Sequence, residues 1–251
     1  MATPRLSSFY KLVTYERIDS TNEEAKRLAA AGVRAGTLVW SDEQLAGRGR
    51  RGRIWTSPPG NLYVSLLLRP GCVPSIACQL NFVAAVALAE TITALLPPGA
   101  SVALKWPNDV LVGGAKVSGI LLEAAAAADH VIDWLVVGVG VNVSNHPPDT
   151  PYPATSLRRE GCRSAPAVVL EAFAKRFEAW HGIWRESGFG RVRDRWLASA
   201  RGLGEAIEIR LEREILRGRF SDLDESGALV LDMGNGGRPP ITTGDIFFPQ
   251  L

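Results

Sequence analysis

The sequence changes character at Ala198-Ser199-Ala200-Arg201-Gly202, and this change limits what the chain can fold into. Before it, helical and strand patterns alternate, whereas only short β-rich runs separated by turns follow it. A stretch without helices must bury its apolar side chains between strands, as small barrels do. We therefore predict an α+β domain over residues 1–202, with a mixed β-sheet packed against helices, and a small β-barrel over residues 203–251. The expected short runs cover residues 206–211, 215–220, 228–231 and 241–248.

The composition is that of an ordinary globular protein. Hydrophobic residues make up 46% and charged residues 22% of the 251 residues, which excludes a disordered or fibrous chain. The formal net charge of +2 means that any basic function must come from a local cluster. The most apolar run, Ile76 to Leu96, contains polar residues and ends at Pro97-Pro98. We predict that it is a buried helix and not a membrane span.

The cysteines and histidines form no disulfide or metal-binding pattern. Cys72, Cys78 and Cys162 are odd in number and contain no CxxC pair, which suits a reducing cytoplasm. The N-terminal segment lacks the apolar stretch and cleavage site of a secretory signal. The histidines, at positions 130, 146 and 181, lack the spacing of metal ligands. We therefore predict a cytoplasmic protein without a protein-bound metal centre.

Hydrophobic periodicity predicts the elements of the first domain. Ser20 and Glu23 have the spacing of a capping box, an apolar helix face follows, and Gly32 is a suitable stop. Gly113-Gly114 is typical of a two-residue hairpin turn. Further strands are expected over residues 37–40, 62–68, 102–104, 110–112, 116–123 and 134–143, and further helices over residues 77–96, 166–186 and 192–198.

Four arginines lie within the seven residues 47–53, whose sequence is GRGRRGR. The run matches GxGxxG, but the helix and the acidic residue that a dinucleotide-binding fold requires do not follow. By itself, an arginine cluster is more typical of a solvated or nucleic-acid-binding loop. This one lies between two predicted strands, and its glycines permit close backbone approach. Because arginine pairs well with phosphate, we predict that the loop closes over a polyphosphate.

Two lysines and a carboxylate are brought together by one predicted hairpin. Lys105 and Asp109 flank the turn in KWPND, and Lys116 lies in the apolar run that follows. A surface turn packed on a tryptophan would explain the first part. Lysine rarely enters an apolar strand without a partner, so Lys116 indicates a functional cluster.

The strand pattern over residues 134–143 contains two glycines, Gly138 and Gly140, at alternate positions. Glycine weakens a strand, and alternate positions face the same side of a sheet. The pair indicates a face kept clear for a ligand or another backbone, with a β-bulge as the alternative.

Taken in order, these segments resemble the biotin–protein ligase family. The matching runs are STNEEA (20–25), EQLAGRGRRGRIWTSPPGNLYVSLLLRP (43–70), KWPNDVLV (105–112), KVSGILLE (116–123) and GVGVNV (138–143). The β-rich tail resembles the family's small SH3-like C-terminal domain, so the resemblance covers nearly the whole chain. It implies an enzyme that converts biotin and ATP into biotinyl-5′-AMP. The biotin is then transferred to a lysine of a biotin carboxyl carrier protein, such as that of acetyl-CoA carboxylase.

The resemblance also implies roles for individual residues. The catalytic residues would be Lys116, Arg50, Asp109 and Lys105. Biotin would be bound by Ser20, Thr21, Asn22, Gln44, Arg48, Gly49, Arg50 and Lys116. The nucleotide would be bound by Arg48, Arg50, Trp55, Asn108, Lys116 and Asn142.

The chemistry of these residues agrees with that reaction. A carboxylate that attacks an α-phosphate brings two anions together, so catalysis depends on positioning and on cationic screening. Arg48, Arg50, Lys105 and Lys116 can supply the cations, together with Mg²⁺ on the phosphates. The acceptor lysine attacks the mixed anhydride directly, so no nucleophile of the enzyme is needed. Asp109 is expected to orient or deprotonate the incoming amine.

Two features depart from other members of the family. Bifunctional members carry an N-terminal helix-turn-helix domain, whereas 19 residues precede Ser20 here. We therefore expect no transcriptional repression and no nucleic-acid partner. Some relatives finish the last strand with an arginine near the nucleotide, where this chain has Phe247-Phe248-Pro249.

Two other functions compete with this interpretation. A lipoate–protein ligase shares the fold and the acyl-adenylate chemistry, and the GRGRRG loop and KWPND favour biotin over lipoate. A nucleic-acid-binding protein could use the arginine loop and the small barrel. It would leave Lys116 and the strand with Gly138 and Gly140 unexplained. The sequence leaves open whether the protein forms a homodimer.

Overall fold

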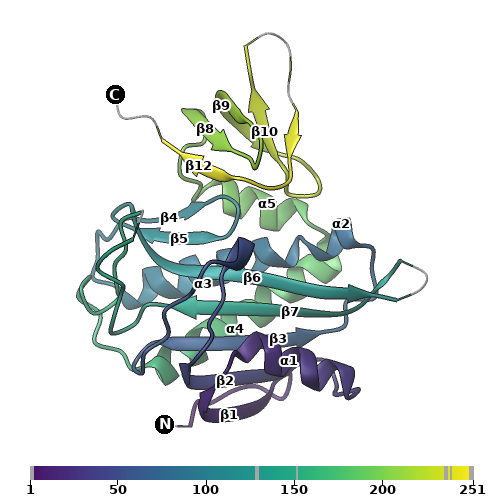
Figure 1. The fold of residues 1–251 in the computed structure, drawn as a ribbon, viewed down its shortest axis with the longest axis vertical. Coiled ribbons are helices and arrows are strands. Elements are labelled where there is room, and N and C mark those ends of the chain that lie inside the picture. Colours follow the sequence, from purple (N-terminus) through teal and green to yellow (C-terminus); the bar gives the residue numbers. More distant parts are fainter. Residues whose placement is uncertain (1–2, 128–129, 151, 235–236, 238, 249–251) are drawn as a thin grey trace.

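The computed structural model describes residues 3–127, 130–150, 152–234, 237 and 239–248. They form a seven-stranded sheet packed with helices and a separate five-stranded sheet (Figure 1). The small sheet caps one end of the molecule, and β1 lies at the other end. The predicted α+β fold with a C-terminal β domain is confirmed, whereas its SH3-like barrel form and the division at residue 202 stay predictions.

The large sheet has the strand order β1-β2-β3-β7-β6-β5-β4. Strands β1 and β2 are parallel, and all other neighbours are antiparallel. The strands are β1 (Lys11–Ile18), β2 (Thr37–Gln44), β3 (Leu62–Leu68), β4 (Val102–Lys105), β5 (Asp109–Val112), β6 (Ala115–Ala126) and β7 (Ile132–Val141). The helices are α1 (Thr21–Ala30), α2 (Pro74–Ala77), α3 (Leu80–Leu95), α4 (Pro166–Ser187), α5 (Gly190–Leu197) and the 3-10 turn η1 (Arg50–Gly52).

Alternate side chains of the central strands are buried against different helices. On one face, Val39, Leu67 and Val136 pack against Ala25 and Ala29 of α1. Their sequence neighbours belong to the larger core on the opposite face, which α3 and α4 cover. Because successive residues of a strand point to opposite faces, strands buried on both sides become continuously apolar. This explains why LYVSLLL in β3 is buried at every position.

Helix α3 is the buried helix predicted from the most apolar run. The segment Pro74–Leu95 is long and apolar enough to cross a membrane, but 78% of its most apolar window is buried inside the protein. A core helix covered on all sides carries apolar residues around its whole circumference. The predicted helix over residues 77–96 corresponds to α3, and the short helix α2, which ends at Ala77, precedes it.

The small sheet has the order β11-β10-β9-β8-β12 and is fixed to the large domain beside β4. Backbone hydrogen bonds join Leu104 N to Ser199 O (2.7 Å) and Arg201 N to Leu104 O (2.8 Å). The buried Trp106 Nε1–H donates to Gly227 O (3.1 Å). These contacts place the small sheet next to the turn between β4 and β5. Its strands are β8 (Ala206–Arg210), β9 (Ile215–Leu223), β10 (Leu229–Asp232), β11 (Pro240–Ile241) and β12 (Asp245–Phe247).

The structure differs from the sequence analysis in three local features. Strand β1 was not predicted, because it lies at the sheet edge and contains no fully buried residue. The capping box is absent: Ser20 has an N-cap backbone but makes no side-chain cap hydrogen bond, and Glu23 pairs with Lys26 and Arg48 instead. The predicted strand 241–248 is two strands, β11 and β12, separated at Gly244 with φ +152°. Pro249 lies outside the described residues.

Candidate active site

One cavity of about 360 Å³ collects the residues that the sequence singled out. It lies where α1, the arginine loop, the β4–β5 turn, β6, β7 and β12 meet. The lining residues that were predicted as site residues are Ser20, Thr21, Asn22, Gln44, Arg48, Gly49, Arg50, Trp55, Lys105, Asn108, Asp109, Lys116 and Asn142. The structure therefore brings together residues more than 120 positions apart, while their roles stay predictions.

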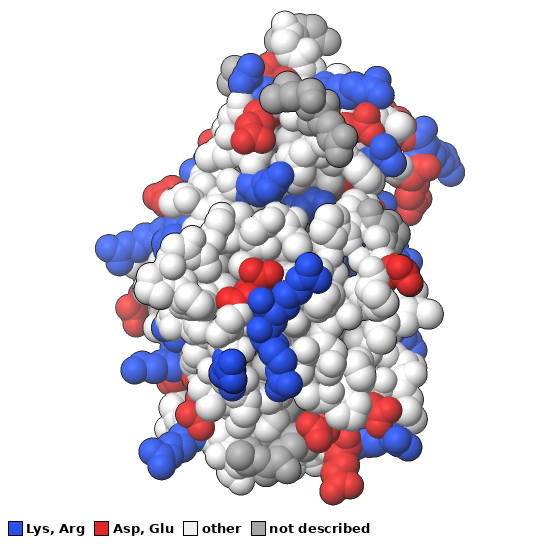
Figure 2. Space-filling view, turned by 90° about the vertical axis from the view of Figure 1, so that its left-hand side faces the viewer, with Lys and Arg blue, Asp and Glu red and all other residues white. Residues whose placement is uncertain are grey.

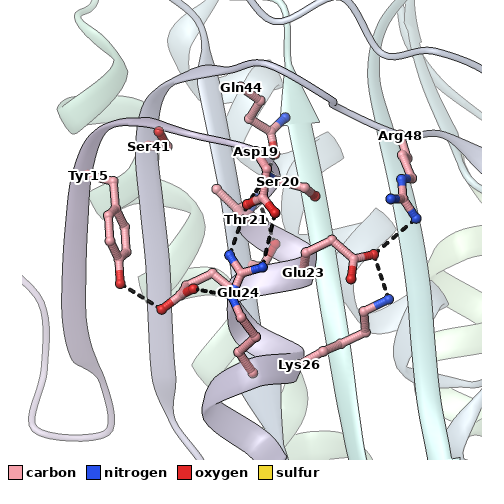
Figure 3. A network of polar contacts seen from close by, with 12 residues as sticks. Tyr15, Asp19, Ser20, Thr21, Glu23, Glu24, Lys26, Ser41, Gln44 and Arg48 are labelled. Carbon is pink, nitrogen blue, oxygen red and sulfur yellow. Dashed lines mark hydrogen bonds and ion pairs between the residues drawn. The ribbon is translucent and has the colours of Figure 1, made fainter.

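A buried hydroxyl of the sheet fixes the start of α1. The Ser65 hydroxyl in β3 donates to Asn22 Oδ1 (2.5 Å) and lies 2.8 Å from Thr21 Oγ1. Gln44 Oε1, at the end of β2, accepts from both the backbone N–H and the hydroxyl of Thr21 (2.9 and 3.0 Å). Figure 3 shows Ser20, Thr21 and Gln44 side by side at this end of the cavity. Since buried polar groups with fixed partners lose little entropy on binding, this neutral end is preorganised.

Gly138 and Gly140 make room for side chains of the site. A Cβ on Gly138 would lie 2.1 Å from Asn22 Oδ1, and one on Gly140 would lie 2.5 Å from the Trp55 ring. The sequence predicted a face kept clear for a ligand or another backbone. The structure shows that the strand is cleared for Asn22 and Trp55, which themselves line the cavity.

The Trp55 indole lies over Gly140 of β7, next to the charged side chains of the cavity. Lys116 Nζ lies 5.3 Å from the centre of this ring, and a Cβ on Gly119 would lie 3.1 Å from it. Lys116 Nζ is also 2.5 Å from Asp109 Oδ1, so the strand lysine has the carboxylate partner that its apolar surroundings require. The hairpin turn of β5 and β6 creates this pair, with Gly113 and Gly114 both at positive φ.

The arginine loop is a short hairpin that bends back over the cavity. A β-bridge joins Arg48 and Ile54, and Gly49 N donates to Arg53 O (2.7 Å). Arg48 pairs with Glu23 of α1 at 3.1 Å (Figure 3). Arg48 thus joins this loop to the first turn of α1.

The other side of the arginine loop contacts the C-terminal domain. Asp245 of β12 accepts from Arg53 at 2.9 Å and from Arg51 at 3.4 Å. Arg50 donates to Thr243 Oγ1 (3.1 Å) and to Asn108 Oδ1 (3.3 Å). Burial lowers the pKa of Arg50 from its usual value, an effect that the Asp245 charge partly offsets. The guanidiniums are therefore held above the cavity from two domains.

The two asparagines predicted to bind the nucleotide connect neighbouring segments of the cavity wall. Asn108 Nδ2 donates to Ile120 O (2.6 Å), which ties the β4–β5 turn to β6. The buried Asn142 side chain donates to Thr155 O (3.0 Å), and its backbone bonds to Val117 and Leu157. Both asparagines also line the cavity, so each contributes to the structure of the wall and to the site.

Sequence reasoning missed four residues of this arrangement: Ser65, Glu123, Tyr152 and Asp245. Glu123 accepts from Asn22 Nδ2 (2.8 Å) and Lys26 Nζ (2.9 Å), and it follows directly on the KVSGILL run. A serine inside the apolar LYVSLLL run was a usable signal for a buried polar contact. Tyr152 and Asp245 carry no such local signal, because loop and domain packing alone bring them to the cavity.

Among the described residues, no group of three or more His, Cys, Asp or Glu side chains could hold a metal ion. The carboxylates that line the cavity are Asp109, Asp149 and Asp245. Asp109 is paired with Lys116, and Asp245 with two arginines.

Comparisons with known proteins agree with this geometry. Residues 8–198 match the Biotin/lipoate A/B protein ligase family, and residues 202–248 match the Biotin protein ligase C terminal domain. The chain is 41% identical over 238 residues to the biotin–[acetyl-CoA-carboxylase] ligase of Paracoccus denitrificans, covering 92% of this chain and 98% of that protein. It is 34% identical to the bifunctional ligase/repressor BirA of Bacillus subtilis, covering 90% of this chain and 70% of that protein.

A solved structure gives the same result. The biotin protein ligase from Aquifex aeolicus in complex with biotin and ATP superposes with a TM-score of 0.79 at 31% identity. The match covers 94% of this chain and 97% of that one. Sequence, fold and the order of the motifs around the cavity therefore agree that this chain belongs to the biotin–protein ligases of the biotin/lipoate protein ligase family.

Proposed function

We propose that this protein is an ATP-dependent biotin–[carboxyl carrier protein] ligase that uses the cavity described above for both half-reactions. The observation that carries the proposal is the division of one cavity into a neutral, hydrogen-bonded end and a cationic end, with Lys116 between them. A small uncharged ring bearing a carboxylate fits the first end and directs that carboxylate to the second. The nucleotide phosphates belong at the cationic end.

In the first half-reaction, a biotin carboxylate oxygen attacks the α-phosphorus of ATP, and the bond to the bridging oxygen breaks. Biotinyl-5′-AMP forms and pyrophosphate leaves with the electron pair of that bond. Lys116 lies beside Asp109 on a strand of the sheet, so its ammonium has a fixed position. We assign it the screening of the two anions as they meet. The loop arginines Arg48 and Arg50 close over the intermediate.

In the second half-reaction, the acceptor lysine amine attacks the carbonyl carbon of the mixed anhydride, and AMP leaves with its phosphate. The amine must lose a proton for the amide to form. Asp109 is the carboxylate next to Lys116, 2.5 Å away, and lines the cavity. We assign it the orientation or deprotonation of the incoming amine.

The residues of the cavity fit Mg²⁺ held mainly by the nucleotide. Mg²⁺ in nucleotide sites keeps several waters and binds phosphate oxygens with one or two carboxylates. Of the lining carboxylates, Asp109 and Asp245 are paired with cations, and Asp149 is the third. When bound, Mg²⁺ would neutralise phosphate charge and favour departure of pyrophosphate.

The acceptor that we propose is the biotin carboxyl carrier protein of acetyl-CoA carboxylase or of a related biotin-dependent carboxylase. The name of the Paracoccus relative supports this choice. We propose the cytoplasm as the location, which suits the odd number of cysteines and the absence of a CxxC pair. A homodimer stays a prediction, and sedimentation of the free and liganded protein would test it.

Nucleic-acid binding is the alternative from another class, and we propose that it is not a function of this chain. Arg48, Arg51 and Arg53 pair with carboxylates of the same molecule. On the face drawn in Figure 2, basic and acidic side chains alternate around a small basic group. Tight, sequence-selective duplex binding at physiological salt would contradict the proposal, whereas weak binding that salt removes would not.

The decisive experiment measures the mass of the carrier domain before and after the reaction. The protein is incubated with ATP, Mg²⁺, biotin and a carboxylase carrier domain. The carrier mass should rise by one biotinyl group, with AMP and pyrophosphate as products. ADP and phosphate would contradict the adenylate mechanism. Lipoate in place of biotin, alone and in competition, tests the lipoate ligase alternative, which the named relatives do not favour.

A further inference from the structure

Lys105 differs from the other cations of the cavity in its surroundings. The loop arginines and Lys116 each have a carboxylate, amide or hydroxyl oxygen as partner. Lys105, at the end of β4, has aromatic rings as its neighbours instead. Its Nζ lies 4.6 Å from the ring centre of Tyr152 and 5.8 Å from that of Phe248. Among the described residues, this ammonium makes no hydrogen bond or ion pair with an oxygen atom.

The rings come from two parts of the chain that are remote from β4. Tyr152 lies in the loop after β7, and its ring is 5.5 Å from that of Phe247 in β12. Phe248 follows β12 directly and also lies 4.8 Å from the Arg201 guanidinium. A loop of the large domain and the C-terminal tail therefore meet on either side of one lysine.

An ammonium over a ring face is attracted by the ring's quadrupole, and this attraction uses none of its N–H donors. The rings can thus fix the position of Lys105 while its hydrogen-bonding capacity stays available to an anion. A carboxylate partner would neutralise the charge and occupy donors. Burial lowers the pKa of Lys105, and the nearby Asp109 charge partly opposes this effect. An anionic ligand would stabilise the charged form further.

We propose that Tyr152 and Phe248 are positioning residues that hold the Lys105 ammonium, with its donors free, for the phosphates of the nucleotide. The inference rests on the proposed function, because it takes ATP as the ligand of the cationic end. It also assigns a role to the tail, which here lacks an arginine near the nucleotide. The C-terminal domain thus acts on the phosphates through Lys105, without a cation of its own in contact with them.

The test measures adenylate formation by pyrophosphate release, with KM determined separately for ATP and for biotin. Tyr152→Leu should raise KM for ATP about three- to tenfold, the range expected for a partly buried cation–π contact. KM for biotin should change by less than about twofold. Tyr152→Phe retains the ring and should behave like the wild type. Phe248→Leu should give a smaller shift in the same direction, because its ring is more distant.

A double-mutant cycle separates this role from direct contact between the ring and the nucleotide. In a Lys105→Met background, Tyr152→Leu should add no further increase in KM for ATP. Phe9→Leu is the matched control, because this ring packs on Tyr10 and His181 away from the cavity. If Tyr152→Leu has the same effect with and without Lys105, or none in either, the inference is wrong. If Tyr152→Leu does not fold, Phe248→Leu in the same cycle decides.

The wild-type protein distinguishes this failure from failure of the proposed function. Wild type that releases pyrophosphate only when biotin is present, together with an unchanged Tyr152→Leu variant, overturns the inference alone. Wild type that forms no biotinyl-5′-AMP overturns both.

Discussion

The neutral and the cationic end of the cavity differ in the elements that supply their residues and in the contacts that hold these residues in place. At the neutral end, residues of α1, β2 and β3 are joined by short hydrogen bonds around the buried Ser65. At the cationic end, side chains from loops, the β4–β5 turn and the C-terminal domain meet through ion pairs and cation–π contacts. Recognition of a neutral ring requires fixed donors and acceptors, whereas binding of phosphates requires charge. The difference indicates that biotin and ATP are controlled by separable sets of residues.

Replacing Lys116 should give the largest effect, because this lysine lies between the two ends. Loss of a charge-assisted hydrogen bond costs about 1.5–3 kcal/mol, or about one to two decades in rate. We expect Lys116→Gln to slow single-turnover formation of biotinyl-5′-AMP by that factor. Lys175→Gln, at an exposed position of α4, is the matched control. Adenylate formation at the wild-type rate would show that the assigned role is wrong.

The two strand glycines offer the sharpest test of the comparison. Gly138→Ala places a methyl group against Asn22, and Gly140→Ala places one against Trp55. Overpacking costs about 1–3 kcal/mol. We expect Gly138→Ala to raise KM mainly for biotin and Gly140→Ala to raise KM mainly for ATP, each about tenfold.

Gly182→Ala in α4 is the control for these two variants, since a Cβ there meets nothing within 4 Å. The same pattern of KM changes for both glycine variants would contradict the division into two ends. It would instead indicate that β7 moves as one unit.

The contact between the arginine loop and β12 should have a smaller effect. Asp245 pairs with Arg51 and Arg53, which are partly exposed, and such pairs contribute about 0–1 kcal/mol each. We expect Asp245→Asn to speed release of biotinyl-5′-AMP about two- to fivefold, with little change in its rate of formation. Asp133→Asn removes a comparable pair with Arg69 away from the cavity and serves as control. An unchanged release rate would mean that the loop is held by other contacts.

The sequence predicted most of the cavity because the motifs lie at strand ends and in turns. The proximity of Lys116 and Asp109 could be inferred from one hairpin, because a two-glycine turn brings β5 and β6 together. The exact pair could not, because Asp109 faces Gly119 and Lys116 faces Leu111 across the strands, and only the side chains meet. Helix α3 and strand β3 were readable from their apolar runs. These features depend on local sequence and on the two periodicities of secondary structure.

What the sequence did not predict depends on contacts between distant segments. The Ser20–Glu23 spacing suggested a capping box, but Arg48 and Lys26 compete successfully for the Glu23 carboxylate. Strand β1 carries a weak pattern because it covers a sheet edge. Asp245 reaches the cavity because the C-terminal domain packs beside β4, and Tyr152 reaches it because its loop pairs with β6 at Lys116. Such tertiary contacts override local preference, and no pattern of spacing encodes them.

A pH experiment on His181 should have the smallest effect on the cavity. The ring is stacked between Phe177 and Trp184, at 5.8 Å from each, on the side of the protein covered by α4. Burial, with a contribution from the Arg185 charge, lowers the pKa of His181 to about 4. An unfolded chain binds this proton near pH 6.5, so the unfolded state holds more protons between pH 6.5 and 4. Stability should therefore fall as the pH is lowered through this window.

The expected loss is about 1 kcal/mol, or about 2–4 °C in Tm, because the ring is partly exposed and solvent reduces the effect. His181→Phe keeps an aromatic ring in the stack and removes the titration, so its Tm should depend less on pH between 6.5 and 4. The hydrogen bonds with Arg27 lower the pKa of Asp19 to about 2, so this carboxylate stays ionised in the same window. At pH 7.5 the variant should keep both KM values within about twofold of wild type, since His181 belongs to neither end of the cavity. If Tm falls equally in both proteins, other groups carry the pH dependence, and a shift in one KM would show that α4 influences that end of the cavity.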